Sequence, residues 1–236
     1  NFSDMVKTAI SEKADIIFSG AGLPLDLPSY LEKESKTKLV PIVSSSRAAK
    51  LICEKWRNNY DYLPDAIVVE GPKAGGHLGY KNDQIEDEHF SLEYIVPEVI
   101  EVIKAYEKSG HCKIPVIAAG GIADGRGIAA AFMLGAKGVQ MGTHFVVTDE
   151  SQVHENYKER IIKAKDIDSR VTGRTTGHPV RALRNDMTRK YLELENAGAE
   201  FEELFARATA KINKLFKADD SYRSVIISGS GTSSNE

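Results

Sequence analysis

The chain has 236 residues, of which 42% are hydrophobic and 28% charged, as in a globular protein with a sizeable buried core. Its formal net charge is −3, and no run of Lys and Arg suggests the basic stripe of a nucleic-acid-binding protein. No apolar stretch reaches the roughly 20 residues that cross a bilayer, and the opening residues NFSDMVKTAI lack the order of a secretory signal. Cys53 and Cys112 have no redox or metal-ligand spacing. We therefore expect a cytoplasmic protein that binds neither nucleic acid nor membrane.

Five short apolar runs, each with Gly or Ser near its carboxyl end, predict buried parallel strands. They are residues 14–20, 38–44, 65–71, 114–121 and 138–145. Helical spacing of apolar residues lies between these runs. Ser3 is a candidate N-cap of the first helix, Pro97 is expected in the first turn of the third, and Asp124 should cap a helix that stops near Gly135. This alternation predicts an α/β fold with a parallel sheet.

The pattern changes after residue 146. Residues 152–165 and 181–195 are predicted as helices, an apolar stripe runs from Phe201 to Leu215, and the last residues are rich in Gly and Ser. We therefore divide the chain into an α/β barrel portion at 1–146, a helical segment at 147–220 that packs on it, and a flexible tail at 221–236.

Two architectures compete for the α/β portion. A flavodoxin-like open sheet needs only five strands. A (β/α)₈ barrel needs eight strands and usually about 250 residues. Counting alone favours the open sheet, or else a barrel whose opening strands lie before residue 1.

The segment EGPKAGGHLG (70–79) directly follows a predicted strand. Gly75 and Gly76 would let the backbone approach a planar ligand, and His77 would project from the carboxyl end of the strand, where such folds place active sites. Histidine can transfer a proton near neutral pH. A solvated histidine in a glycine-rich turn is the alternative, and we favour the functional interpretation.

Two glycine-bearing turns follow the last two predicted strands. Gly120 and Gly121 form the first, and Gly142 with Thr143 forms the second. Neighbouring loops of this kind can bind a phosphate monoester through backbone N–H groups, and barrels often place such a site after strands seven and eight. If these strands are the seventh and eighth, the preceding three are the fourth to sixth, which favours the barrel.

EGPKAGGHLG and the later block IPVIAAGGIADGRGIAAAFMLGAKGVQMGTHFV together resemble the nitronate monooxygenase family, formerly called 2-nitropropane dioxygenase, and the related flavin-dependent enoyl-acyl-carrier-protein reductase II. The resemblance implies a TIM-type (β/α)₈ barrel, lacking its first strands in this chain, that holds non-covalent FMN. It implies that His77 is the catalytic residue and that the cofactor-binding residues are Glu70, Gly71, Gly75, Gly76, Ala119, Gly120, Gly121, Gln140, Gly142 and Thr143.

The resemblance leaves two reactions open. A nitronate monooxygenase oxidises alkyl nitronates with O₂ and needs no nicotinamide, whereas an enoyl reductase uses NAD(P)H to reduce an enoyl thioester. We favour the first by a small margin, with a small-molecule substrate and a homodimer as the candidate assembly. Arg174, His178 and Arg181 are weaker candidates that could meet a phosphopantetheine or a substrate carboxylate.

Other classes remain as alternatives. No His, Asp or Glu cluster has metal-ligand spacing, so we expect no metal. A barrel like that of inosine monophosphate dehydrogenase is disfavoured, because the loop that should hold its nucleophilic cysteine has none. An incomplete or non-catalytic flavin-binding fragment and a flavodoxin-like electron carrier are the further alternatives.

Overall fold

The computed structural model describes residues 2–197 and residue 207. They form two compact units. The first comprises the described residues up to Ala74 together with Asp83–Phe145, and the second comprises Gly75–Asn82 together with the described residues from Val146 on.

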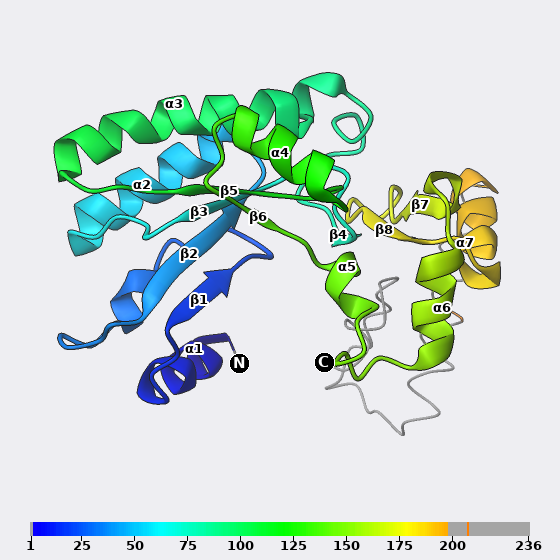
Figure 1. The fold of residues 1–236 in the computed structure, drawn as a ribbon, viewed down its shortest axis with the longest axis horizontal. Coiled ribbons are helices and arrows are strands. Elements are labelled where there is room, and N and C mark those ends of the chain that lie inside the picture. Colours follow the sequence, from blue (N-terminus) through cyan, green and yellow to red (C-terminus); the bar gives the residue numbers. More distant parts are fainter. Residues whose placement is uncertain (1, 198–206, 208–236) are drawn as a thin grey trace. The chain divides into compact units, whose positions relative to one another are not determined.

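The first unit contains a five-stranded parallel sheet (Figure 1). Its strands are β1 (Ile16–Ser19), β2 (Lys38–Val43), β3 (Ile67–Glu70), β5 (Val116–Ala119) and β6 (Gly138–Gln140). Each lies within one of the five predicted runs, so the prediction of five parallel strands is confirmed.

The order of the strands separates the two candidate architectures. The sheet runs β1-β2-β3-β5-β6, so every strand pairs with the next parallel strand along the chain. A flavodoxin-like sheet reverses direction and has the order 2-1-3-4-5, whereas continuous sequential pairing is the arrangement of a (β/α)₈ barrel. The first unit is therefore part of a TIM-type barrel.

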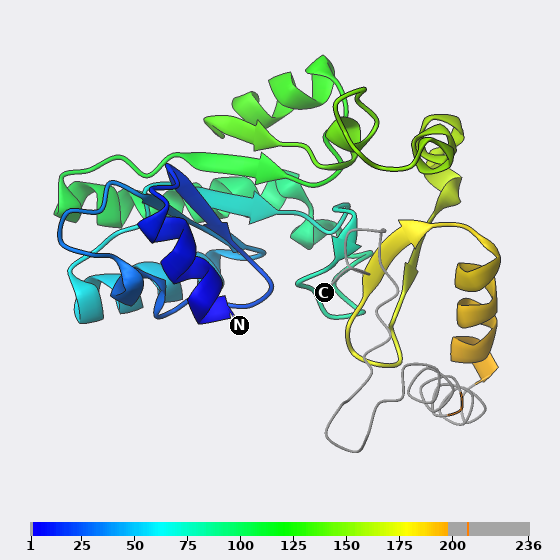
Figure 2. The ribbon, with the colours of Figure 1, turned by 90° about the horizontal axis from the view of Figure 1, so that it is seen from below.

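The helices of the first unit are α1 (Phe2–Ser11), α2 (Ser46–Tyr60), α3 (Leu92–Gly110) and α4 (Gly125–Met133), with 3-10 turns at Leu27–Tyr30 and Glu88–Phe90. The short α5 (Thr143–Val146) begins in the first unit, and its last residue belongs to the second. Helices α2 and α3 pack side by side over the sheet (Figures 1 and 2). Trp56 of α2 is fully buried in the core, and its indole N–H donates to the Pro24 carbonyl at 2.9 Å. Because a buried indole N–H needs a partner, this bond fixes how the loop after β1 packs on α2.

Several local predictions about the first unit are tested directly. Asp124 caps α4 as predicted, since its carboxylate accepts from the backbone N–H groups of Arg126 and Gly127. Ser3 is not an N-cap, because α1 already includes Phe2. Pro97 lies in the second turn of α3 rather than the first, because the helix begins at Leu92.

The outermost strands differ from the prediction of strands buried on both faces. Ile16 and Phe18 of the edge strand β1 are 48% and 50% exposed. The run 138–145 is a strand only as far as Gln140, and the helix α5 begins at Thr143. Apolar composition predicted that these segments are strands, but their exposure depends on which neighbours cover them.

The second unit contains a three-stranded antiparallel sheet in the order β4-β8-β7. Its strands are β4 (Gly76–His77), β7 (Ser169–Thr172) and β8 (Val180–Leu183), and its helices are α6 (Glu155–Lys163), the 3-10 turn Asp166–Asp168 and α7 (Asp186–Ala197), which packs along β7 (Figure 2). The helix predicted at 152–165 is confirmed over a shorter span. The described residues after 146 form the strands β7 and β8 in addition to helices.

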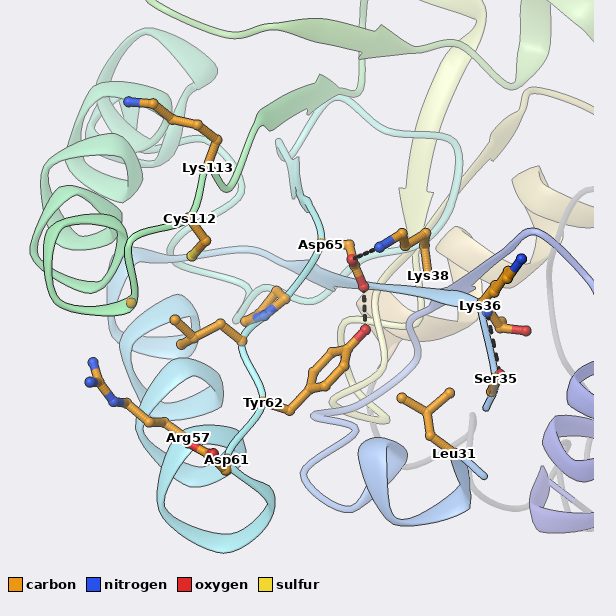
Figure 3. A pocket seen from close by; sticks show the side chains of 14 residues that line it. Leu31, Ser35, Lys36, Lys38, Arg57, Asp61, Tyr62, Asp65, Cys112 and Lys113 are labelled. Atoms are coloured by element: carbon orange, nitrogen blue, oxygen red, sulfur yellow. Dashed lines mark hydrogen bonds and ion pairs between the residues drawn. The ribbon is translucent and has the colours of Figure 1, made fainter. Parts of the chain in front are cut away.

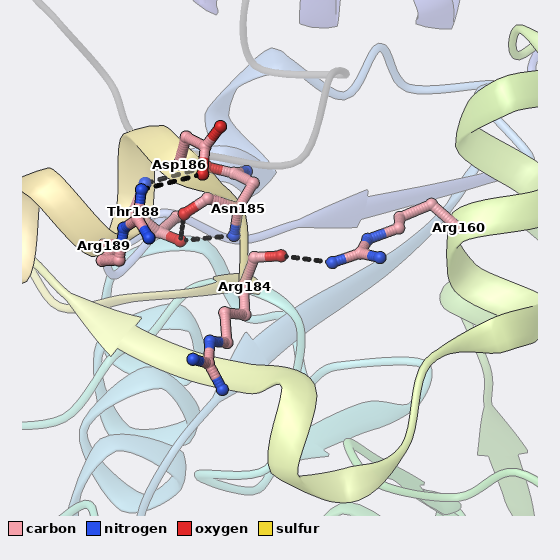
Figure 4. Close-up of polar contacts among 6 residues, drawn as sticks. All are labelled: Arg160, Arg184, Asn185, Asp186, Thr188 and Arg189. Atoms are coloured by element: carbon pink, nitrogen blue, oxygen red, sulfur yellow. Dashed lines mark hydrogen bonds and ion pairs between the residues drawn. The ribbon is translucent and has the colours of Figure 1, made fainter.

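The helix predicted at 181–195 begins later than expected. Val180–Leu183 forms β8, and α7 starts only at Asp186. Thr188 donates its backbone N–H to the Asn185 side chain, and the Asn185 N–H donates to the Thr188 hydroxyl, both at 2.8 Å (Figure 4). This reciprocal pair satisfies N–H groups at the start of the helix, so it explains why the strand ends and the helix begins here.

The predicted stripe from Phe201 to Leu215 and the predicted tail at 221–236 lie outside the described residues, apart from Arg207. None of the described helices combines the length and the apolar composition that spanning a bilayer requires.

Candidate functional site

Three of the predicted cofactor-binding residues lie in a row across the first unit's sheet. Glu70 ends β3 and is paired with Ala119, which ends β5 and is paired with Gln140, the last residue of β6. The Gly71 N–H continues this edge by donating to the Ala119 carbonyl at 2.9 Å. These residues therefore mark the carboxyl edge of the parallel sheet, where α/β folds bind ligands.

Glu70 is half-buried at this edge. Burial raises the pKa of its carboxyl group above the ordinary value, because desolvation disfavours the charged form. A carboxyl group with a raised pKa at the carboxyl end of a strand is typical of a functional position.

The turn after β5 needs glycine at two successive positions. Gly120 and Gly121 have φ angles of +98° and +75°, which favour glycine. A Cβ on Gly120 would lie 3.0 Å from the Gly71 carbonyl oxygen, and a Cβ on Gly121 would lie 2.9 Å from the Lys73 Cβ. These two glycines therefore let the loops after β3 and β5 pack closely together.

Gly142 has a different role, because it lies in open space. No described heavy atom lies within 4 Å of the position that a Cβ on Gly142 would occupy. Both Gly142 and Thr143 are exposed. Backbone flanked by open space at this edge of the sheet can accept a ligand group without moving any other residue.

His77 belongs to the second unit, where it lies on β4 opposite Val180 of β8. Its ring lies beside that of His178, with the ring centroids 5.9 Å apart and the planes inclined at 62°. Both histidines are exposed. Arg181 is opposite Gly76 and so lies on the other face of this sheet, where its guanidinium donates to the Ser169 hydroxyl at 3.1 Å.

The predicted site residues thus fall into two sets. Those at the edge of the parallel sheet, or in the loops directly after it, are Glu70, Gly71, Ala119, Gly120, Gly121, Gln140, Gly142 and Thr143, all in the first unit. Gly75, Gly76 and His77 are in the second unit. His178, which the sequence indicated only as a weaker candidate, lies against His77, whereas Arg181 does not share their face.

A cavity of about 430 Å³ in the first unit lies away from this edge (Figure 3). Its walls include Lys38 at the start of β2, and Asp65 and Cys112 shortly before β3 and β5, so it opens at the amino ends of the strands. The Asp65 carboxylate pairs with the Lys38 ammonium at 2.8 Å and raises the pKa of that ammonium, and it also accepts from the Tyr62 hydroxyl. These polar groups satisfy one another, so the cavity is not the candidate active site.

The glycine turns at the carboxyl edge of the parallel sheet are compatible with a phosphate monoester such as that of FMN. The sharp turn at Gly120–Gly121 and the open backbone at Gly142 and Thr143 leave backbone N–H groups that phosphate oxygens can approach. The described residues contain no group of three or more His, Cys, Asp or Glu placed to hold a metal ion.

The comparisons with known proteins agree on one family. The family model described as nitronate monooxygenase matches residues 1–236. The chain belongs to the nitronate monooxygenase family. A protein of Staphylococcus saprophyticus named "Probable nitronate monooxygenase" is 32% identical over 197 residues, which are 83% of this chain and 51% of that protein.

Two solved structures are similar to the chain. FabK from Thermotoga maritima is 39% identical with a TM-score of 0.67, and the match covers 89% of this chain and 59% of FabK. Nitroalkane oxidase from Streptomyces ansochromogenes is 26% identical with a TM-score of 0.61, over 80% of this chain and 50% of the oxidase. The chain spans about half the length of the curated relatives it matches.

Proposed function

We propose that the chain is part of an FMN-dependent oxidoreductase that oxidises alkyl nitronates with O₂. The observation that carries this proposal is the row Glu70, Ala119 and Gln140 at the carboxyl edge of a barrel-type sheet, followed by the Gly120–Gly121 and Gly142–Thr143 loops. Membership of the nitronate monooxygenase family supports the same reaction. The homodimer and the cytoplasmic location expected from the sequence stay predictions.

Each set of residues has a separate task in this proposal. The backbone N–H groups of Gly120, Gly121, Gly142 and Thr143 hold the FMN phosphate. Glu70 and Gln140 contact polar parts of the cofactor, and the raised pKa of Glu70 favours a carboxyl group that can donate a hydrogen bond. FMN supplies the redox chemistry when it is bound. Gly75 and Gly76 provide the close backbone approach that the resemblance implies.

His77 is the proton-transfer residue in this proposal. Its imidazole nitrogen takes a proton from the carbon atom next to the nitro group when the substrate is a nitroalkane, and donates a hydrogen bond to an oxygen when the substrate is already a nitronate. The exposed position of His77 on β4 leaves its ring accessible to a small molecule.

The second candidate is the NAD(P)H-dependent reduction of an enoyl thioester. It is favoured by one observation, namely that the chain is more similar in sequence to FabK, an enoyl-acyl-carrier-protein reductase II, than to the nitroalkane oxidase. His77 would then orient the thioester carbonyl or supply a proton to the reduced substrate.

Anaerobic bleaching of the flavin tests both candidates. The purified full chain, reconstituted with FMN, is mixed separately with propane-2-nitronate, NADH and NADPH. Bleaching by the nitronate alone, lost in His77→Ala, supports the proposed reaction, whereas bleaching by a nicotinamide alone supports the reductase. If the chain retains no FMN, both reactions are contradicted for this polypeptide. The chain is then an incomplete flavin-binding fragment.

A further inference from the structure

His77 and His178 lie side by side, with their ring centroids 5.9 Å apart. No hydrogen bond of either ring is found within the described residues. In three other histidines a ring nitrogen is already used: His89 contacts the Asp87 carboxylate, His111 contacts the Lys108 carbonyl, and His154 accepts from the Asn156 N–H. His77 on β4 and His178 in the turn before β8 therefore have ring N–H groups available for a ligand.

The turn that carries His178 is rigidly built. Gly173 has a φ of +79°, and a Cβ there would lie 2.2 Å from the His178 carbonyl oxygen. The His178 N–H and the Thr176 hydroxyl both donate to the Gly173 carbonyl, at 3.1 Å and 3.0 Å. The Thr175 N–H and hydroxyl both donate to Glu195 of α7 at 3.2 Å. Hydrogen bonds within the turn, together with those from Thr175 to α7, therefore hold the turn in place.

The same turn is fastened to the segment that carries His77. The Leu78 N–H donates to the Pro179 carbonyl at 2.9 Å, and the Asn82 side-chain amide donates to the Arg174 carbonyl at 2.6 Å. His77 and His178 are therefore each followed by a residue that joins the two segments. These bonds fix the backbone of His77 relative to the backbone of His178.

We propose that His77 and His178 form a clamp for one planar oxyanion, in which each imidazole donates one N–H to a different oxygen. Ring centroids 5.9 Å apart place the two imidazoles in contact with each other, so the anion lies against their outer edges, where an N–H of each ring can reach a different oxygen at about 2.8 Å. A nitronate or a carboxylate has two such oxygens sharing one negative charge. The choice of the nitronate, which is the anionic form of the substrate, rests on the proposed function.

Anion binding is measured on the full chain without flavin. The imidazole nitrogen signals of the histidines are followed by NMR during titration with propane-2-nitronate, with acetate, and with acetamide as the uncharged analogue. The variants are His77→Phe and His178→Phe, which keep a ring but remove its N–H groups. His89→Phe is the matched control, because that side chain is 78% exposed and belongs to the first unit.

Both rings should respond together to the nitronate and to acetate, and acetamide should have no effect. Each clamp variant should bind either anion about tenfold more weakly, because each loses a charge-assisted hydrogen bond, while His89→Phe binds like the parent chain. A response of one ring only, or unchanged binding by His178→Phe, would overturn the clamp. Intact anion binding without flavin bleaching would reject the proposed function and leave the clamp in place.

Discussion

Asp65 and Leu39 exchange two hydrogen bonds in the first unit: the Leu39 N–H donates to the Asp65 carboxylate at 2.9 Å, and the Asp65 N–H donates to the Leu39 carbonyl at 3.1 Å. The same carboxylate binds the Lys38 ammonium and accepts from the Tyr62 hydroxyl (Figure 3). One side chain thereby joins the start of β2 to the residues that lead into β3.

Replacing this carboxylate should therefore destabilise the first unit. Asp65→Asn keeps the shape but removes the charge that Lys38 and the Leu39 N–H contact, so we expect a loss of about 1–3 kcal/mol in the free energy of unfolding. Urea denaturation measures it. Asp61→Asn is the control: Asp61 is an exposed acid in the wall of the same cavity with a φ of +50°, a conformation that asparagine tolerates. Equal stabilities of the two variants would contradict the role of Asp65.

Stability should fall at alkaline pH, with Cys53 responsible for part of the slope. Burial, and secondarily the nearby Cys112, raises the pKa of the fully buried Cys53 thiol to about 12. Above the ordinary thiol pKa, the unfolded chain has lost this proton while the folded chain keeps it. The folded state is therefore penalised by about 1.4 kcal/mol per pH unit until the pH reaches about 12.

Denaturant unfolding at several pH values between the ordinary thiol pKa and about 12 tests this. In Cys53→Ala the free energy of unfolding should fall less steeply with pH, by the contribution of one proton. The cavity that this substitution creates should lower stability at every pH. Cys112→Ala should keep most of the slope, because burial is the larger cause of the shift. Tyr106, whose pKa burial also raises to about 12, should continue to contribute in both variants. Parallel curves for Cys53→Ala and the parent chain would refute the prediction.

Gly142 and Gly125 form a matched pair for testing the phosphate loop. Neither has a described heavy atom within 4 Å of an added Cβ, so alanine should leave the thermal stability of the chain nearly unchanged at both positions. If the FMN phosphate packs against Gly142, Gly142→Ala should weaken FMN binding about tenfold or more, since a methyl group would displace a hydrogen-bonded oxygen. Gly125→Ala should bind FMN like the parent chain. Fluorescence titration of FMN measures both, and equal affinities would argue against the phosphate position.

Gly173 should be far less tolerant than Gly177. Both have positive φ angles, +79° and +73°, so alanine costs about 1–2 kcal/mol at either position. Only at Gly173 would the added Cβ also collide with the His178 carbonyl oxygen. We expect Gly173→Ala to lose clearly more stability than Gly177→Ala and to weaken acetate binding, because His178 must move. Thermal unfolding and the NMR titration measure these effects, and a Gly173→Ala variant that binds acetate normally would show that the turn does not position His178.

The parallel sheet could be predicted because its strands are short apolar runs, and the barrel architecture because glycine turns follow the last two of them. The second sheet could not. Ser169–Thr172 and Val180–Leu183 have four residues each, contain arginine, and match a helical pattern as well as a strand. One local signal was available, since Gly173 and Gly177 enclose a turn between these strands and indicate a hairpin.

The candidate site was predictable in part for the same reason. Motifs indicated Glu70, His77 and the two glycine turns as candidates, because each lies next to a strand in the sequence. The neighbour of His77 was harder to find, since β4 pairs with a strand from a distant part of the chain and no local pattern reports that pairing. The sequence indicated His178 only as one of three polar residues in the late segment. Only the pairing of β4 with β8 shows that His178 lies beside His77 and that Arg181 lies on the other face.

The insertion of Gly75–Asn82 into the second unit also bears on the order in which the protein can be built during synthesis. β4 emerges from the ribosome between β3 and β5, but its partner β8 follows roughly a hundred residues later, a separation that makes such pairing slow. The strands and helices of the first unit can associate on the ribosome as they appear. The strand that carries His77 gains its partner only after Val180–Leu183 has been translated, so a nascent chain can hold a folded parallel sheet while His77 is still unplaced.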